Sequence, residues 1–94
     1  MRYNLDFVRK RFCETKGNNP KAVLLLRIGS LYHALYEDAF LVARLTGYPV
    51  QRLYGYSRLL HCGFPHEQLS ETVGRLRSAG YRAVVRTELP GAKS

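Results

Sequence analysis

The run from Ala22 to Ala39 constrains the fold of this chain most strongly. It begins with a continuous apolar stretch, Ala22 to Leu26, which has the length of a strand. It then turns at Gly29-Ser30 and continues as a segment with almost no polar face, which we interpret as a buried helix. A buried strand that leads into a buried helix predicts the core of a small α/β unit. Because Gly29 has no side chain and Ser30 can cap the helix that follows, a ligand could also approach the backbone at this turn.

The length and charge of the chain bound its organisation and its partners. Its 94 residues are enough for one domain with a single core, which we place at residues 1–88, followed by a loose tail over residues 89–94. The net charge of +8 favours an anionic partner, most often nucleic acid. The alternative is that the basic excess serves solubility alone.

Cysteine usage and hydropathy indicate the compartment. Cys13 and Cys62 are far apart, which fits neither a zinc-binding motif nor a disulfide framework and points to a reducing environment. The first residues, Met1 to Asn4, lack the apolar run of a signal peptide. No apolar stretch approaches the roughly 20 residues of a membrane span. We therefore expect a cytoplasmic protein without a membrane partner.

Periodicity and turn residues predict the remaining elements. Ser30 would cap the second helix, Gly55 would lie at the tip of a hairpin, and the segment from Cys62 to Pro65 would form a further turn. In chain order, we predict a helix over 4–17, a strand over 22–28, a helix over 31–46, a hairpin over 48–61, a helix over 66–79 and a strand over 81–88. This order predicts an α+β fold, a mixed β-sheet of about four to six strands packed against about three helices.

Arg27 and a cluster of basic residues in the first predicted helix are candidate phosphate contacts. Arg27 ends the first apolar strand, so it either pairs with an acid such as Glu37 or Asp38 or points at a phosphate. The first predicted helix carries Arg9-Lys10-Arg11 and Lys16, which form either a phosphate contact or a solvated helix face.

Aromatic and basic residues alternate in the predicted hairpin. They are Tyr48, Arg52, Tyr54, Tyr56 and Arg58. This mixture suits stacking on bases combined with phosphate contacts. It also suits an exposed sheet face with cross-strand tyrosine–arginine pairs. Arg52 and Arg58 are therefore candidate nucleic-acid contacts.

The sequence gives no sign of a catalytic or metal site. No nucleophile stands beside a base, and His33, His61 and His66 lack the spacing of metal ligands. Glu37 and Asp38 are adjacent on a predicted helix, where neighbouring side chains point apart. We therefore predict no catalytic residue, no metal, no cofactor and no small-molecule substrate.

Two spaced motifs carry a resemblance to a known family. The first runs from Pro20 through Leu24-Leu25-Leu26-Arg27-x-Gly29 to Tyr32 and Leu35-Tyr36-Glu37-Asp38-Ala39, and the second is Cys62-Gly63-Phe64-Pro65. They resemble the N-terminal mismatch-recognition domain of the bacterial MutS family, in which Arg-x-Gly leads into Asp-Phe-Tyr-Glu and Phe-Tyr-Asp-Asp-Ala, and Ala-Gly-Ile-Pro follows later. The interval from Gly63 to Gly80 fits the family's next helix without a gap. The resemblance covers about residues 12–88.

The resemblance implies a DNA-reading site at the turn. In the family, a Phe wedges beside the mismatched base from the minor groove, and a Glu two residues later hydrogen-bonds that base. Those positions are Leu31 and His33 here, with Tyr32 between them and Ser30 in place of the leading Asp. The resemblance thus implies Ser30, Leu31, Tyr32 and His33 as DNA contacts, beside Arg27. From the residues alone, Leu31 and Tyr32 fit the core as well as a ligand.

Both reading positions differ from the family, which predicts altered or lost mismatch reading. Leu can wedge between base steps but stacks less well than Phe, and one base–aromatic stack is worth about 1–3 kcal/mol. A His at the Glu position can donate a hydrogen bond but does not reproduce a carboxylate.

We therefore predict a non-enzymatic DNA-binding domain that binds duplex DNA, with or without a mismatch, through basic phosphate contacts. The alternative is a protein-interaction module on the same fold that no longer binds DNA. We expect a stand-alone domain, since the chain has no room for the connector, lever, clamp and ATPase parts of the family. The sequence leaves open RNA in place of DNA, a homodimer, and a partner protein acting in trans.

Overall fold

The structure is a computed structural model that describes residues 5–53 and 57–87. Its elements in chain order are α1 (Leu5–Asn18), β1 (Val23–Ile28), β2 (Leu31–Leu35), α2 (Glu37–Thr46), β3 (Val50–Arg52), β4 (Leu60–Pro65), a short 3₁₀ helix (His66–Gln68), α3 (Leu69–Ser78) and β5 (Ala83–Arg86). The predicted hairpin tip at Gly55 and the predicted tail over residues 89–94 lie outside the described residues.

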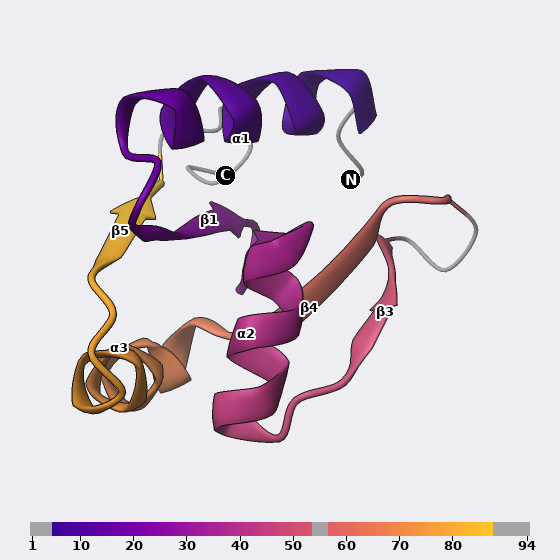
Figure 1. Cartoon of the computed structure of the whole chain (residues 1–94). Coiled ribbons are helices and arrows are strands. Elements are labelled where there is room, and N and C mark those ends of the chain that lie inside the picture. Colours follow the sequence, from indigo (N-terminus) through magenta and orange to yellow (C-terminus); the bar gives the residue numbers. More distant parts are fainter. Residues whose placement is uncertain (1–4, 54–56, 88–94) are drawn as a thin grey trace.

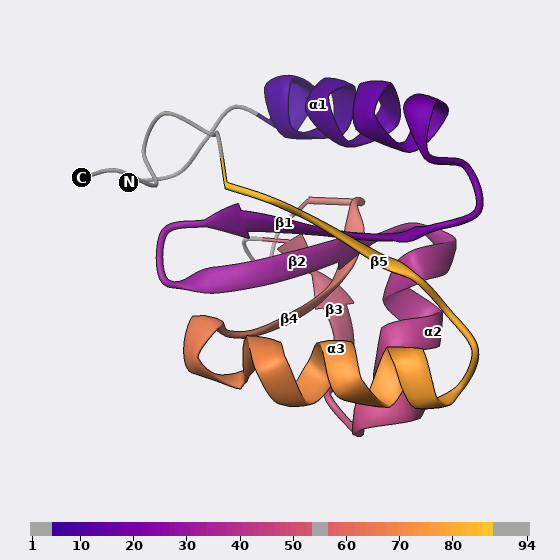
Figure 2. The same cartoon turned by 90° about the vertical axis from the view of Figure 1, so that its left-hand side faces the viewer.

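The described strands form one mixed five-stranded sheet, with the order β3-β4-β2-β1-β5. The β1 and β5 strands are parallel, whereas the other neighbouring strands are antiparallel. Figure 1 and Figure 2 show α1 on one side of this sheet and α2 and α3 on the other. The predicted α+β fold with a mixed sheet and about three helices is confirmed.

The sheet is buried on both faces, which explains the continuous apolar run of β1. Leu24 and Leu26 point toward α1 and pack with Val8 and Phe12. Leu25 points to the opposite face, in the cluster that also contains residues of α2 and α3. Successive side chains of a strand alternate between faces, so a strand covered on both sides needs apolar residues at nearly every position.

The predicted second helix over 31–46 is wrong in its first part. Leu31–Leu35 is strand β2, and α2 begins only at Glu37. Gly29, with φ +63°, and Ser30 connect β1 to β2 in a hairpin, where Ile28 pairs with Leu31. Ser30 is therefore an exposed turn residue and does not cap a helix. A central strand that is covered on both faces has no polar side, which made β2 look like a buried helix.

The predicted turn over residues 62–65 is also wrong, because these residues continue strand β4. This strand pairs with β3 on one side and with β2 on the other. The glycine of the segment, Gly63, serves a close approach: a Cβ on it would lie 3.0 Å from Cε1 of His61. Glycine inside a strand often marks such a crowded place. The helices over 4–17 and 66–79 and the strands over 22–28 and 81–88 are confirmed in kind, with shorter bounds for the last strand.

Tyr36 joins β2 to α2 in a backbone conformation that favours glycine. Within the described residues it is the only non-glycine residue with a positive φ, at +56° with ψ −132°. Its ring makes an edge-on contact with Phe12 of α1, with ring centroids 5.7 Å apart. A residue in such a region stores of the order of 1–3 kcal/mol of backbone strain. The contact with α1 offsets part of that strain.

We expect Tyr36→Gly to be more stable than Tyr36→Ala by about 1 kcal/mol, because both lose the ring but only glycine relieves the backbone. The measurement is the free energy of unfolding in urea. Phe40 is the control, since it is 56% exposed within α2. There Phe40→Gly should be about 1 kcal/mol less stable than Phe40→Ala. The same sign at both positions would contradict the strain at Tyr36.

Candidate nucleic-acid interface

The β1–β2 turn brings together three of the predicted DNA contacts, Arg27, Ser30 and Leu31. The turn lies at one end of the sheet (Figure 2), where Gly29 and Ser30 are exposed and Leu31 is 38% exposed. The backbone N–H of His66 donates to the Ser30 carbonyl at 3.0 Å, which ties the turn to the end of β4. A short, tied hairpin is a rigid platform for its exposed side chains.

Arg27 is held beside the turn and does not form the ion pair considered from the sequence. Its Nε donates to the Gly29 carbonyl at 2.9 Å, and its guanidinium carbon lies 6.0 Å from the centre of the Tyr32 ring. Asp38, one of the proposed partners, instead accepts from Lys16. The hydrogen bond to Gly29 uses only Nε, and the contact with the Tyr32 ring uses none of the N–H donors. The Nη groups of Arg27 are therefore donors for an anion.

The other two residues of the reading motif are buried on opposite faces of β2. Tyr32 is 4% exposed, and its ring stacks on Phe64 with centroids 5.8 Å apart. His33 is 5% exposed and lies on the face that α1 covers. Of the three consecutive residues, Leu31 is therefore the exposed one. Direct DNA contacts by Tyr32 and His33 stay predictions.

His33 forms a close pair with His61, a partner that sequence reasoning missed. Their Nδ1 atoms lie 2.8 Å apart and their ring centroids 4.8 Å apart. Burial and the neighbouring His61 lower the pKa of His33 to about 3, and burial also lowers the pKa of His61. Both rings are therefore neutral at pH 7. The register between β2 and β4 brings the two histidines together. This register can be predicted only when residues 31–35 and 60–65 are both recognised as strands.

Arg52 and Arg58 are exposed, but the structure does not bring them to the turn. Arg52 pairs with Leu60 at the start of β4, whereas Leu31 pairs with Pro65 at its end. Five residues of a strand span about 17 Å. Tyr54 and Tyr56 of the same pattern lie outside the described residues. The ring of Tyr48 stacks on Phe64 with centroids 5.8 Å apart, so it belongs to the packing of the sheet.

A polar hollow between α1 and β5 collects basic groups that the sequence did not bring together. Its volume is about 580 Å³. Arg11 comes from the basic cluster of the first helix, and Arg86 comes from the last strand. The residues that line it are Arg11, Glu14, Thr15, Asn18, Asn19 and Arg86. Guanidinium and carboxamide donors of this kind suit a phosphate oxygen, although Glu14 reduces the local positive charge.

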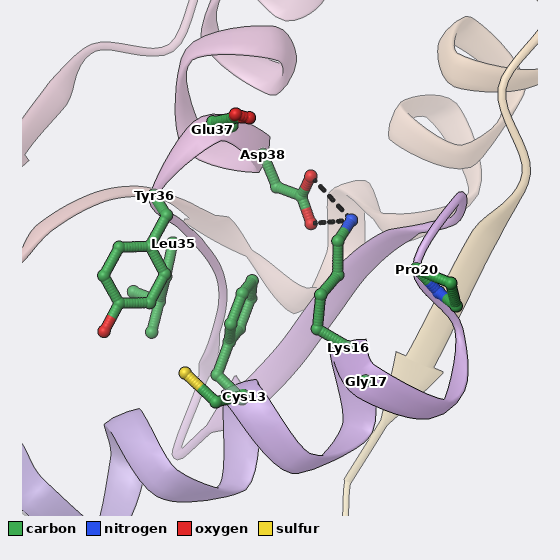
Figure 3. A pocket seen from close by; sticks show the side chains of 9 residues that line it. Cys13, Lys16, Gly17, Pro20, Leu35, Tyr36, Glu37 and Asp38 are labelled. Carbon is green, nitrogen blue, oxygen red and sulfur yellow. Dashed lines mark hydrogen bonds and ion pairs between the residues drawn. The ribbon is translucent and has the colours of Figure 1, made fainter.

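A second cavity, of about 430 Å³, lies between α1 and the start of α2 (Figure 3). Tyr36 and Cys13 lie at one end, and the Lys16–Asp38 ion pair lies at the other. Lys16 also donates to the Ala22 carbonyl, so this ion pair is engaged within the protein, whereas Glu37, which lines the cavity as well, is exposed. No group of three or more metal-ligating side chains occurs in the described part of the chain. The cavity is therefore mainly an apolar packing feature.

Comparisons with a family model and with individual proteins agree on the family of this chain. No helix in the described ranges is long and apolar enough to cross a membrane. The chain is similar to the DNA mismatch repair protein MutS of several bacteria. The MutS of Pelotomaculum thermopropionicum is 33% identical over 81 residues, which are 81% of this chain and 9% of that protein. The MutS of Bacteroides fragilis is 31% identical over 87 residues, 90% of this chain and 10% of that protein.

A third relative, the MutS of Nitrobacter winogradskyi, is 31% identical over 87 residues, 88% of this chain and 10% of that protein. The chain thus spans about a tenth of the length of these relatives. The family model for MutS domain I matches residues 8–93, which include all of the β1–β2 turn and every described strand. The chain belongs to the MutS domain I family.

Proposed function

We propose that this domain binds duplex DNA through basic phosphate contacts, with its β1–β2 turn against the duplex and with altered or lost mismatch reading. The observation that carries the proposal is the exposure of Ser30 and Leu31 on a rigid turn, with Arg27 fixed beside them. The turn occupies the place that the family resemblance assigns to the mismatch reader. The net charge of +8 supports a polyanionic partner.

The separation of the basic residues fits one continuous duplex. Arg52 lies about 17 Å along β4 from the register position of Leu31. Phosphates of one B-DNA strand repeat every 3.4 Å or so along the axis, so this distance corresponds to about five nucleotides. Arg27 would then contact phosphates next to the turn, and Arg52 and Arg58 would contact phosphates farther along. Such contacts position the domain but read no sequence.

The residues at the turn support weaker mismatch discrimination than the family motif gives. Leu31 can enter between base steps but provides no aromatic stacking, which is worth about 1–3 kcal/mol or about 5- to 150-fold in affinity. His33 replaces the carboxylate and is engaged with His61. We therefore propose phosphate-driven binding with little preference for mismatched over matched DNA.

The proposal predicts DNA binding that weakens steeply with salt. Each neutralised phosphate contributes about 0.9 to the slope of log K against log salt. Titrations of matched and single-mismatch duplexes at several salt concentrations measure this slope. Arg27→Gln should lower the slope by about 1 and weaken both duplexes alike. Leu31→Phe should strengthen binding to the mismatched duplex alone, by about tenfold.

Arg75→Gln is the matched control for the arginine variant. Arg75 is exposed on α3 and paired with Glu71 at 3.2 Å, so its loss removes a guanidinium away from the turn. It should change the slope by much less than Arg27→Gln does. Absence of binding at low ionic strength, or binding that does not respond to salt, would overturn the proposal.

The alternative function, a protein-interaction module, is favoured by one observation. Tyr36 is 40% exposed and lines the apolar cavity of Figure 3, and Phe40, four residues later in the chain, is 56% exposed. Exposed aromatic residues beside a cavity are typical of protein interfaces. A chain that forms a stable homodimer and shifts no DNA at low salt would favour this function over the first.

A further inference from the structure

His33 and His61 meet on the same face of the sheet as Leu31. In β2, Leu31, His33 and Leu35 alternate onto the face that α1 covers. Their register partners in β4 are Pro65, Gly63 and His61 in that order. By register, His61 is paired with Leu35 and not with His33. It reaches diagonally to the ring of His33, at an Nδ1–Nδ1 distance of 2.8 Å.

Gly63 provides the space for this diagonal contact. A Cβ at position 63 would lie 3.0 Å from Cε1 and 3.2 Å from Nδ1 of His61, and 3.4 Å from Nδ1 of His33. Any side chain at this position would press on both rings at the point where they meet. The pair is therefore specified by three residues of two neighbouring strands, and His33 has a neighbour that constrains its hydrogen bonding.

The short Nδ1–Nδ1 distance allows one proton between the two rings. A neutral imidazole carries its proton on one nitrogen and a lone pair on the other. One Nδ1 must then donate and the other accept, so the two histidines are opposite tautomers. Either His33 keeps a proton on Nε2 and His61 a lone pair there, or the reverse holds. The pair thus always presents one donor and one acceptor at its Nε2 atoms.

We propose that His61 is a positioning residue for His33, because their Nδ1–Nδ1 hydrogen bond couples the two tautomers: His33 offers a donor at Nε2 when His61 offers an acceptor there, and the reverse. The proposal deepens and rests on the proposed function, because His33 occupies the position that reads the base in the family resemblance. The minor groove presents acceptors on A and T and an added donor on G. A neutral pair can satisfy either kind of group, whereas an ionised carboxylate only accepts.

The experiment measures the tautomer of His33 and DNA binding together. Long-range ¹H–¹⁵N spectra of the ¹⁵N-labelled protein give the tautomer of each histidine, and titrations give the affinity ratio for single-mismatch over matched duplex. The wild type should show His33 and His61 as opposite tautomers. His61→Phe keeps a ring and removes both nitrogens. His33 should then change to the tautomer mixture of an unconstrained histidine, and the affinity ratio should change about fivefold, the size of one neutral hydrogen bond.

His66→Phe is the matched control, because His66 lies outside the pair, with its Nε2 3.6 Å from Glu67. It should leave the His33 tautomer and the affinity ratio unchanged. If His61→Phe does not fold, Gly63→Ala tests the same contact from the other strand. An unchanged His33 tautomer in the folded variant would overturn the proposal, as would two identical tautomers in the wild type. A wild type that shows the opposite tautomers but binds no DNA would instead refute the proposed function.

Discussion

Asp38→Ala is expected to lower the free energy of unfolding by about 3 kcal/mol at neutral pH. The Asp38 carboxylate accepts from Lys16 Nζ at 2.9 and 3.0 Å and from the backbone N–H of Leu24 at 3.0 Å. Asp38 is only 7% exposed. Its removal leaves the buried Leu24 N–H without an acceptor and the Lys16 ammonium without a counter-charge. Because the Lys16 side chain is 30% exposed, water partly solvates its charge, so the expected loss of unfolding free energy is at the lower end of the range for breaking a buried ion pair. Urea unfolding measures the change.

Two further variants separate the contributions of charge and hydrogen bonding. Asp38→Asn keeps an acceptor for Leu24 but loses the charge, so about half of the loss should remain. Glu37→Ala is the matched control, because Glu37 precedes Asp38 on α2 and is exposed. It should change stability by no more than about 0.5 kcal/mol. Equal losses for Asp38→Ala and Glu37→Ala would contradict this account of the ion pair.

Asp38 also connects the packing of the fold to the candidate site. Through Lys16 it fixes the end of α1, and through Leu24 it fixes the start of β1. It stands in the first turn of α2, two residues after the strained Tyr36. These bonds hold the start of α2 against α1 and β1, at the end of β2 that lies opposite to its exposed residue Leu31. Loss of Asp38 should loosen the junction before it affects the turn.

The sequence was sufficient to predict the fold class and most elements, because the information is local. The helix at Leu5–Asn18 follows from its apolar spacing, and the strand at Val23–Ile28 follows from its continuous apolar run. The same argument fails at Leu31–Leu35. A five-residue segment buried on both faces is too short for periodicity to separate helix from strand. The boundary is set by Tyr36, whose positive φ no propensity predicts.

Some features of the candidate site can likewise be predicted from local sequence, and others cannot. The turn at Gly29-Ser30 follows from local sequence, since glycine with a positive φ suits a two-residue turn. The exposure of Leu31 does not follow from it, because the residues alone fit a core position equally well. The depth of His33 does not follow from it either, because it depends on β4, which pairs with β2 about 30 residues later in the chain. The sequence pattern predicts a turn at Gly63, as glycine often indicates, whereas in the fold Gly63 makes room for His61.

Acidification from pH 7 to pH 5 is expected to destabilise the domain by about 2 kcal/mol through His33 alone. Burial and His61 lower the pKa of His33 from 6.5 to about 3 in the folded state. Below pH 6.5 the unfolded chain therefore binds a proton that the folded chain does not. The stability from neutral His33 is complete above about pH 6.5 and is lost progressively as the pH falls toward 3, by about 1.4 kcal/mol per unit. The lowered pKa of His61 adds a loss of the same sign.

Urea unfolding at half-unit steps between pH 7 and pH 5 measures this loss, in a range above the usual pKa of carboxyl groups. The double variant His33→Phe/His61→Phe keeps two neighbouring rings without titrating nitrogens, and its stability should vary much less over the range. His66→Gln should keep the full dependence, because His66 lies at the surface beside Glu67 and outside the pair. A double variant as sensitive to acid as the wild type would place the effect elsewhere. A wild-type stability that does not change between pH 7 and pH 5 would contradict the prediction. It would mean that unfolding takes up no proton at His33 or His61, whereas two buried neutral imidazoles must take up protons when they unfold in acid.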